Sequence, residues 1–201
     1  MKENIYYIGA GRNINEARHP VIFYIKGLRI AYFGYYGTHK HSDSHPAEED
    51  SSGTALRQLP VIQEDIEKYR NIVDFIVVNF HWGIEKAEYP GEDQIQFAHS
   101  VIDYGADLIV GHHPHVLQGI EKYKNKIIAY SLGNFIFGGN SRTNYNTVIL
   151  KIELNKKKDI SASVIPIQVN YWQPELLVGD NAVQLIKSVK SISEKFQETI
   201  F

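Results

Sequence analysis

Two apolar segments separated by a helical pattern place the strongest constraint on how this chain folds. Residues 73–80 (VDFIVVNF) form a nearly continuous run of β-branched and aromatic residues, which is typical of a strand buried on both faces. Residues 93–104 carry apolar side chains at helical spacing, and Gly105 then supplies a common helix stop. Residues 107–110 form a second short apolar run. Strand, helix and strand in this order predict a β-α-β crossover.

The rest of the chain predicts an α/β protein with a substantial antiparallel part. Further strands are expected at 5–8, 21–26, 28–33, 117–123, 126–131, 146–154 and 160–169. Two more helices are expected, over 56–69 and about 181–196. The polar segment 37–53 predicts a long loop.

Composition excludes several classes of protein. The 201 residues include 21 Lys and Arg against 23 Asp and Glu, so the chain lacks the basic excess of nucleic-acid binders. Cysteine is absent, which excludes disulfides, thiolate catalysis and cysteine-ligated zinc. The longest apolar runs are far shorter than the ~20 residues of a membrane helix, and the first residues form no apolar signal core. We expect a single domain over residues 1–201, with no nucleic-acid partner and no membrane span.

Both strands of the crossover run directly into histidines. His81 follows the first strand, and the second leads into the sequence GHHPH at 111–115. Ligand sites of open α/β sheets form outside the carboxyl ends of the strands, so His81 is expected close to His113 and His115. An extended backbone would point His113 and His115 to the same side. A lone histidine is usually a satisfied polar side chain, but this concentration favours a metal or phosphate site, and neutral imidazoles suit Zn, Mn or Fe.

Several spaced motifs also carry a resemblance to a known family. The motifs are Gly9-Ala10-Gly11-Arg12-Asn13, His81-Trp82-Gly83-Ile84-Glu85, Gly105-Ala106-Asp107, the GHHPH sequence and Tyr130-Ser131-Leu132-Gly133-Asn134-Phe135. In this order they resemble the CapA family of bacterial poly-γ-glutamate capsule biosynthesis proteins, over most of residues 5–154. That family is similar in turn to calcineurin-like metallophosphoesterases, whose sandwich of two sheets flanked by helices usually holds two metal ions.

The resemblance implies a metallophosphatase-like α/β/β/α sandwich with a divalent metal, Mn, Fe or Zn. By position, His81, His113 and His115 match metal ligands, with His112 as the competing register for the Gly-His-x-His motif. His81 and His113 would also be catalytic, because a histidine at the site can protonate a leaving group. Glu85 and Asn134 are expected to bind substrate, although Asn134 equally suits a strand-ending turn.

Three motifs that precede the others in the family, a Gly-Asp on its first strand, Asn-x-Glu and Asn-Asn-His, do not occur in the N-terminal part of this chain. The chain is therefore expected to be the C-terminal part of the family domain, without its N-terminal strands and helices. Its metal site would be incomplete and would bind a single ion weakly. Glu85 and Asp93 could reach the site but do not resemble bridging ligands. An uncovered sheet edge beside 73–80 predicts pairing with a second copy or with a complementary N-terminal chain.

Two function classes remain open. One is a CapA-like protein in the biosynthesis or export of an anionic capsule polymer, poly-γ-glutamate, which binds the polymer or its synthesis complex. The alternative is an active metal-dependent phosphoesterase or hydrolase, in which metal activates water. The absent motifs favour the first class, and a truncated product without activity is a third reading. Family members are usually anchored outside the membrane, whereas this chain shows no anchor, so its compartment stays open.

Overall fold

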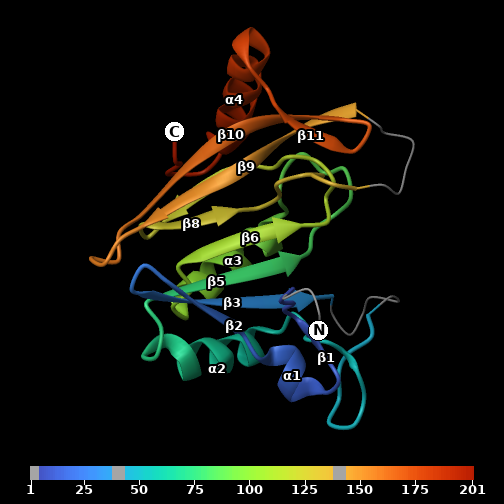
Figure 1. Cartoon of the computed structure of the whole chain (residues 1–201), viewed down its shortest axis with the longest axis vertical. Coiled ribbons are helices and arrows are strands. Elements are labelled where there is room, and N and C mark those ends of the chain that lie inside the picture. The colour runs from blue at the N-terminus through green and yellow to red at the C-terminus, as the bar shows by residue number, and fades with distance from the viewer. Residues whose placement is uncertain (1–4, 38–43, 138–143) are drawn as a thin grey trace. The chain divides into compact units, whose positions relative to one another are not determined.

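The β-α-β crossover expected from the sequence is present at the centre of the first of two units. The computed structural model describes residues 5–37, 44–137 and 144–201. The first unit comprises residues 1–82 and 96–109, and the second comprises 83–95 and 110–201. Strand β6 (Leu108–His112) begins in the first unit and ends in the second. Figure 1 shows the elements of both units.

The first unit is built on a hairpin and a buried parallel strand. β2 (Val21–Ile25) pairs antiparallel with β3 (Leu28–Tyr36), and β3 pairs parallel with β5 (Phe75–His81). The run 73–80 is buried along most of its length, which confirms the prediction of a strand covered on both faces. β5 lies between β3 and β6, so the expectation of an open edge beside 73–80 is wrong. β2 is the outermost strand at one end of the sheet that contains β3, β5 and β6.

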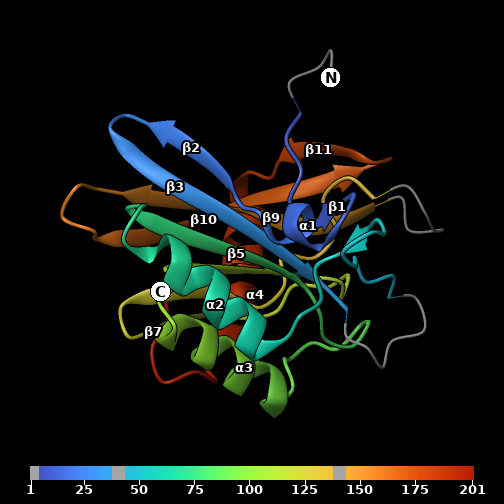
Figure 2. The same ribbon diagram turned by 90° about the horizontal axis from the view of Figure 1, so that it is seen from below.

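Aromatic contacts hold two helices on this sheet. α2 (Leu59–Arg70) places Tyr69 against Phe33 of β3, with ring centroids 5.6 Å apart. α3 (Glu92–Asp103) places Phe97 against Phe80 of β5, at 5.5 Å. Figure 2 shows the two helices side by side. The predicted helices 56–69 and 93–104 are thus confirmed, with ends shifted by a few residues.

Two smaller parts of the first unit differ from what the sequence predicted. Residues 5–8 form no strand, and their large side chains are mostly exposed. Instead β1 (Ala10–Gly11) pairs with β4 (Gly53–Thr54), and the short helix α1 (Ile14–Arg18) follows. Apolar character alone predicted the strand at 5–8, but a strand needs a partner for its backbone groups. The predicted loop 37–53 lies partly outside the described residues.

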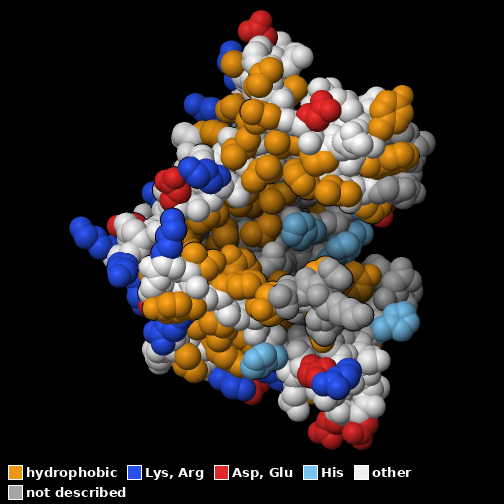
Figure 3. Space-filling view, viewed as in Figure 1, with side chains coloured by type: hydrophobic (Ala, Val, Ile, Leu, Met, Phe, Trp, Pro, Cys, Tyr) orange, Lys and Arg blue, Asp and Glu red, His pale blue; other side chains and the backbone are white. Residues whose placement is uncertain are grey.

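The second unit contains the predicted antiparallel part. β7 (Ile120–Tyr123) and β8 (Lys126–Ala129) form a hairpin, and β8 also neighbours β6. A separate sheet has the order β11 (Gln173–Leu176), β10 (Ile160–Asn170), β9 (Asn144–Leu154). Hydrophobic side chains gather over this sheet in Figure 3. β11 was not predicted from the sequence, because it is short, wholly exposed and contains a proline.

The last helix closes the second unit. α4 (Gly179–Ser193) matches the predicted helix at about 181–196. Its last residue, Ser193, accepts a hydrogen bond at its Oγ from the backbone N–H of Ile120 in β7 (2.9 Å). Among the residues that the structure describes, no helix is long and apolar enough to cross a membrane.

Candidate metal centre

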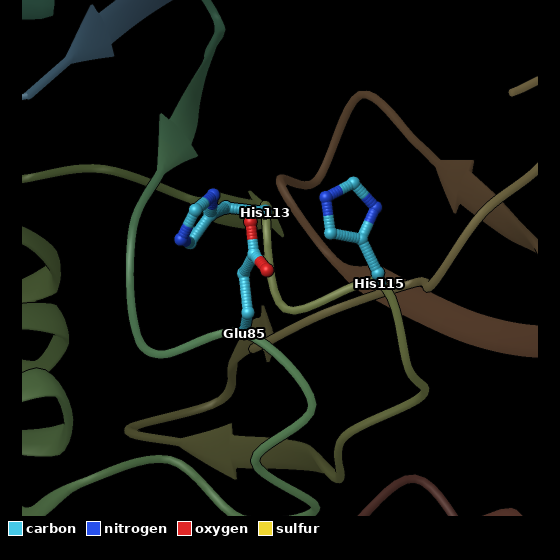
Figure 4. A group of neighbouring side chains, drawn as sticks. All are labelled: Glu85, His113 and His115. Atoms are coloured by element: carbon cyan, nitrogen blue, oxygen red, sulfur yellow. The ribbon is translucent and has the colours of Figure 1, made fainter. Parts of the chain in front are cut away.

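Three potential metal ligands converge in the second unit. Glu85, His113 and His115 each offer one ligand atom, and these atoms all lie within 4.8 Å of one another. Figure 4 shows the Glu85 carboxylate between the two imidazole rings. Glu85 comes from the loop that precedes α3, and the histidines follow β6. Segments almost thirty residues apart in the sequence therefore build one group.

Backbone hydrogen bonds hold the Glu85 loop against the histidine segment. The N–H of Lys86 donates to the carbonyl of Pro114, which lies between the two histidines (2.8 Å). The Nε2 of Gln118 donates to the carbonyl of Ala87 (2.9 Å), and the Gln118 side chain is fully buried. Both bonds anchor the two residues that follow Glu85, which limits the freedom of Glu85 before any ligand binds.

The backbone at the two histidines is not extended. His113 has φ +102° and His115 has φ +61°, so the expectation of an extended His-x-His segment is wrong. Their rings still come together, with centroids 6.0 Å apart. Left-handed backbone at residues with a Cβ costs free energy and is concentrated at functional sites, where the surrounding structure enforces it. Here the bond from Lys86 to Pro114 supplies part of that constraint.

Asn134 orients one of the candidate ligands. The Nδ1 of His115 lies 2.7 Å from Oδ1 of Asn134. Since an amide oxygen only accepts, the Nδ1 carries the proton and the Nε2 keeps a lone pair for a metal. Asn134 is itself positioned by the turn that begins at Ser131, whose hydroxyl donates to the Val116 carbonyl (2.7 Å). The predicted role of Asn134 in binding substrate stays a prediction.

The donor set fits a divalent transition metal. Two imidazoles and one carboxylate are a common protein ligand set for Zn and for non-haem Fe, and three protein ligands leave coordination positions open. Glu85 is exposed, and its carboxylate forms no hydrogen bond or ion pair with the described residues. The sequence had predicted that Glu85 binds substrate and is not a metal ligand. The available signal for a ligand was its position four residues after His81, in a loop that turns at Gly83 (φ +84°).

The two other histidines of the motifs lie outside this group. His81 ends β5 in the first unit, where its ring packs against Tyr36 with centroids 5.0 Å apart. Its role as a ligand stays a prediction. His112 is exposed at the end of β6, and desolvation by neighbouring protein atoms lowers the pKa of its imidazole. Of the two registers, the His113 and His115 pair is the one that converges with Glu85.

A partly buried arginine of the first unit escaped the sequence analysis. The guanidinium of Arg57 lies over the ring of Phe97, 4.9 Å from its centroid, and 6.0 Å from that of Trp82. Its Nε is buried without a hydrogen-bond partner among the described residues. Burial lowers the pKa of this guanidinium. Trp82 itself is buried and stacks on Phe80 at 4.8 Å, so it serves packing.

The family model and the curated relatives that match this chain agree on one family. The model of the family described as bacterial capsule synthesis protein PGA_cap matches residues 1–139. The capsule biosynthesis protein CapA of Bacillus anthracis is 32% identical over 173 residues, which cover 84% of this chain and 42% of that protein. The PGA biosynthesis protein CapA of Bacillus subtilis (strain 168) is 31% identical over 184 residues, which cover 91% of this chain and 48% of that protein. The chain thus spans less than half the length of these relatives.

Solved structures show the fold. The NAD nucleotidase (NadN) of Haemophilus influenzae superposes with a TM-score of 0.50 at 18% identity, over 95% of this chain and 37% of that chain. At this identity the likeness concerns the fold alone. It confirms the metallophosphatase-like α/β fold that the motifs imply.

Proposed function

Because the chain belongs to the family of the bacterial capsule synthesis protein PGA_cap, we propose that it acts in the biosynthesis or export of a poly-γ-glutamate capsule, through a divalent-metal site. The observation that carries the proposal is the convergence of Glu85, His113 and His115 within 4.8 Å. The family relatives named above have capsule or PGA biosynthesis in their names. They are more than twice as long as the matched region, so the role of the whole protein is transferred only as a proposal.

The three residues would hold one ion. Glu85 contributes the charged oxygen, and His115 contributes the nitrogen that the Asn134 contact leaves free. A divalent ion bound here supplies a Lewis acid for a phosphoryl or carbonyl oxygen. Zn, Mn and Fe all suit imidazole and carboxylate ligands. Binding is expected to be weak, because Glu85 is exposed and must lose its hydration.

The charge of the site supports an anionic partner. Glu85 alone carries one negative charge and repels carboxylates. With a divalent ion the same group carries a net positive charge and attracts them. Recognition of the anionic polymer, or of the complex that makes it, would therefore depend on metal.

An active phosphoesterase or hydrolase is the second candidate. It is favoured by one observation, that three protein ligands leave open coordination positions. In this reading His81 moves a proton at the reacting groups, since His113 is held as a metal ligand. The absence of the early family motifs from this chain argues against full activity of the chain alone.

Metal binding by variants tests the site. Isothermal titration with Mn²⁺, Fe²⁺ and Zn²⁺ should give one equivalent for the wild type. Glu85→Gln and His113→Ala should each weaken binding by ~100-fold, because each removes one of three ligands. His112→Ala is the matched control, since His112 lies next to the group but outside it. Loss of metal in His112→Ala with retention in His113→Ala would establish the competing register.

A polymer-binding assay then tests the function. Poly-γ-glutamate should bind to the metal-loaded protein and not after treatment with a chelator. Equal binding in both states would remove the metal from the proposed role. Turnover of an aryl phosphate should stay near background, and robust Mn²⁺-dependent hydrolysis that His113→Ala abolishes would establish the second candidate instead.

Asn134 provides a graded test of the same site. Asn134→Ala removes the acceptor that fixes His115, so metal affinity should fall by ~10-fold to ~100-fold, the usual effect of losing such a contact. Asn134→Asp keeps an acceptor and should restore most of the affinity. Unchanged affinity in Asn134→Ala would show that His115 does not bind the ion through Nε2.

The outer edge of β2 is the proposed pairing site for a protein partner. This strand is last in its sheet order, and Ile22, Tyr24 and Ile25 are exposed. An apolar edge strand without a neighbour pairs readily with another chain. A second copy, or a chain that carries the early motifs, is the proposed partner. Light scattering should show a dimer at micromolar concentration that Tyr24→Lys dissociates, and a monodisperse monomer would contradict the homodimer.

A further inference from the structure

A cavity of about 380 Å³ in the second unit is lined, among the described residues, by side chains without charge. It lies where residues of β9, β10 and α4 meet, and Figure 1 shows α4 above these strands. Five of its lining residues are polar: Asn146, Gln168, Asn181, Gln184 and Ser188. None of them belongs to the metal centre described above.

Secondary structure explains why these side chains converge. Asn146 and Gln168 are directly opposed in the register of β9 and β10, so they project from the same face of the sheet. Asn181, Gln184 and Ser188 follow one another at spacings of three and four residues, which places them on one side of α4. Each wall of the cavity therefore presents a row of hydrogen-bonding groups.

The cavity also has an apolar part. Leu177 and Leu185 line it, and both are buried. Small-ligand sites usually combine apolar surface with a few convergent polar groups, and this cavity has both, with polar residues in the majority. Its volume falls within the range of about 300–1,000 Å³ common to such sites.

The chemistry of the lining excludes most ligand classes. Among the described residues, the lining contains no Lys, Arg or His to neutralise a phosphate or carboxylate, and no Asp or Glu to hold a cation. The described lining also offers no aromatic ring on which a base or a sugar could stack. Asn and Gln side chains each offer two N–H donors and a carbonyl acceptor. Within the described part of the chain, none of the five polar side chains forms a hydrogen bond, and four of them are exposed, so a ligand can reach them in exchange for water.

We propose that this cavity binds an uncharged ligand that carries secondary amides, such as two or three units of a peptide-like chain. A secondary amide offers one N–H and one C=O on opposite edges. The opposed carboxamide rows of the sheet and of α4 match both edges at once. The inference is independent of the proposed metal site, because the two share no residue.

Side-chain amide signals in ¹⁵N NMR spectra give a direct test. Terminally blocked triglycine serves as the α-linked probe, and a blocked dimer of γ-linked isoglutamine serves as the γ-linked probe. Titration of either should shift the NH₂ signals of Asn146, Gln168, Asn181 and Gln184. A dissociation constant on the order of 0.1–1 mM is expected for probes with about twenty heavy atoms. Tighter binding of one probe identifies the source of the amide, a protein segment or a γ-linked polymer.

Two variants of α4 sharpen the test. Gln184→Leu keeps the size and helix propensity of the residue but removes its hydrogen bonds, and it should weaken binding of the blocked peptide by ~10-fold or more. Lys187→Leu is the matched control, since Lys187 is exposed on the same helix but does not line the cavity. Both positions are exposed, so both variants should fold as the wild type does.

Three results would overturn the inference. The first is the absence of any shift of the four NH₂ signals at probe concentrations of tens of millimolar. The second is an equal shift of these signals by glucose or acetate, which carry no amide. The third is equal affinity of Gln184→Leu and Lys187→Leu for the blocked peptide.

Discussion

Two carboxylates of the first unit and one of the second have opposite environments. In the first unit, Asp65 and Asp107 are only 5% and 4% exposed, and each accepts hydrogen bonds from an arginine. In the second unit, Glu85 is exposed and lies against two imidazoles. A buried charge must be paired to be tolerated, whereas an exposed one stays available for a ligand. The difference separates carboxylates that stabilise the fold from one that is free to bind.

The structural carboxylates join helices to strands. Arg70 of α2 donates to Asp107 (2.6 Å), which also accepts from the N–H of Ile76 in β5 (2.8 Å). Asp65 of α2 accepts from Arg18 (2.8 Å) and from the hydroxyl of Tyr35 in β3 (2.8 Å). The second unit has a comparable carboxylate in Glu121, which accepts from Tyr130 (2.6 Å). Exposure, more than the unit, therefore marks Glu85 as different.

The largest expected effect is the loss of the ion pair at Asp107. Arg70→Ala leaves a buried carboxylate without its cation and should lower the free energy of unfolding by about 3–5 kcal/mol, measured by urea denaturation. Metal affinity should be retained in the fraction that stays folded. Arg29→Ala, which breaks a more exposed pair with Asp74, is the control and should cost about 1 kcal/mol or less. Similar losses in the two variants would contradict a structural role for Asp107.

Removal of one hydroxyl should have a smaller effect that depends on pH. Tyr35→Phe deletes the hydrogen bond to Asp65 and should cost about 1–3 kcal/mol near neutral pH. Burial, and to a lesser degree the charge of Asp65, raises the pKa of Tyr35 well above its usual range. Folding thus favours the neutral phenol. The stabilisation that the buried neutral phenol provides is fully present at pH values below about 10, the pKa of tyrosine in the unfolded chain. It is lost as the pH rises beyond that value.

The difference in stability between wild type and Tyr35→Phe should therefore shrink above pH ~10. Urea denaturation at several pH values measures it. Tyr24→Phe is the control, because Tyr24 is 76% exposed. A difference that stays constant through this pH range would show that Tyr35 is not desolvated in the folded state.

A substitution at the metal centre should raise stability. His113→Gly relieves the backbone at φ +102° and should increase the free energy of unfolding by about 1 kcal/mol, while it removes a ligand. Lys124→Gly, at φ +49° in the β7–β8 turn, is the control and should stabilise without changing metal affinity. Destabilisation by His113→Gly would mean that His113 contributes more to packing than to a ligand site.

The smallest effect concerns an exposed ion pair of the first unit. Hydrogen bonds from Arg12 hold the pKa of the Glu16 carboxyl at about 2. Arg12→Gln should return this pKa to about 4.3, measured by NMR titration of the side chain. Any stabilisation by the ion pair is present at pH values above about 4.3, the pKa of Glu in the unfolded chain, and is lost as the pH falls toward 2. Because both groups are solvated, stability at neutral pH should barely change, and a substantial loss there would show a structural role.

Periodicity predicted most of the elements, because it reports which face of a segment is buried. The crossover of β5, α3 and β6, the β2–β3 hairpin and α4 all lie where their patterns placed them. It failed at residues 5–8 and at β11, where burial does not decide the structure. The open edge beside 73–80 was instead expected from the family strands that this chain lacks, and it is wrong, since sheet order depends on contacts between distant segments.

The sequence by itself determined that histidines stand at the ends of two buried strands, and the family motifs followed from the same residues. Only the tertiary structure brought Glu85 to His113 and His115. The physical reason is that the ligands stand on loops, whose backbone lacks a repeating pattern that the sequence could reveal. Their conformation depends on single long-range hydrogen bonds, such as that from Lys86 to Pro114, and these form only once the fold is in place.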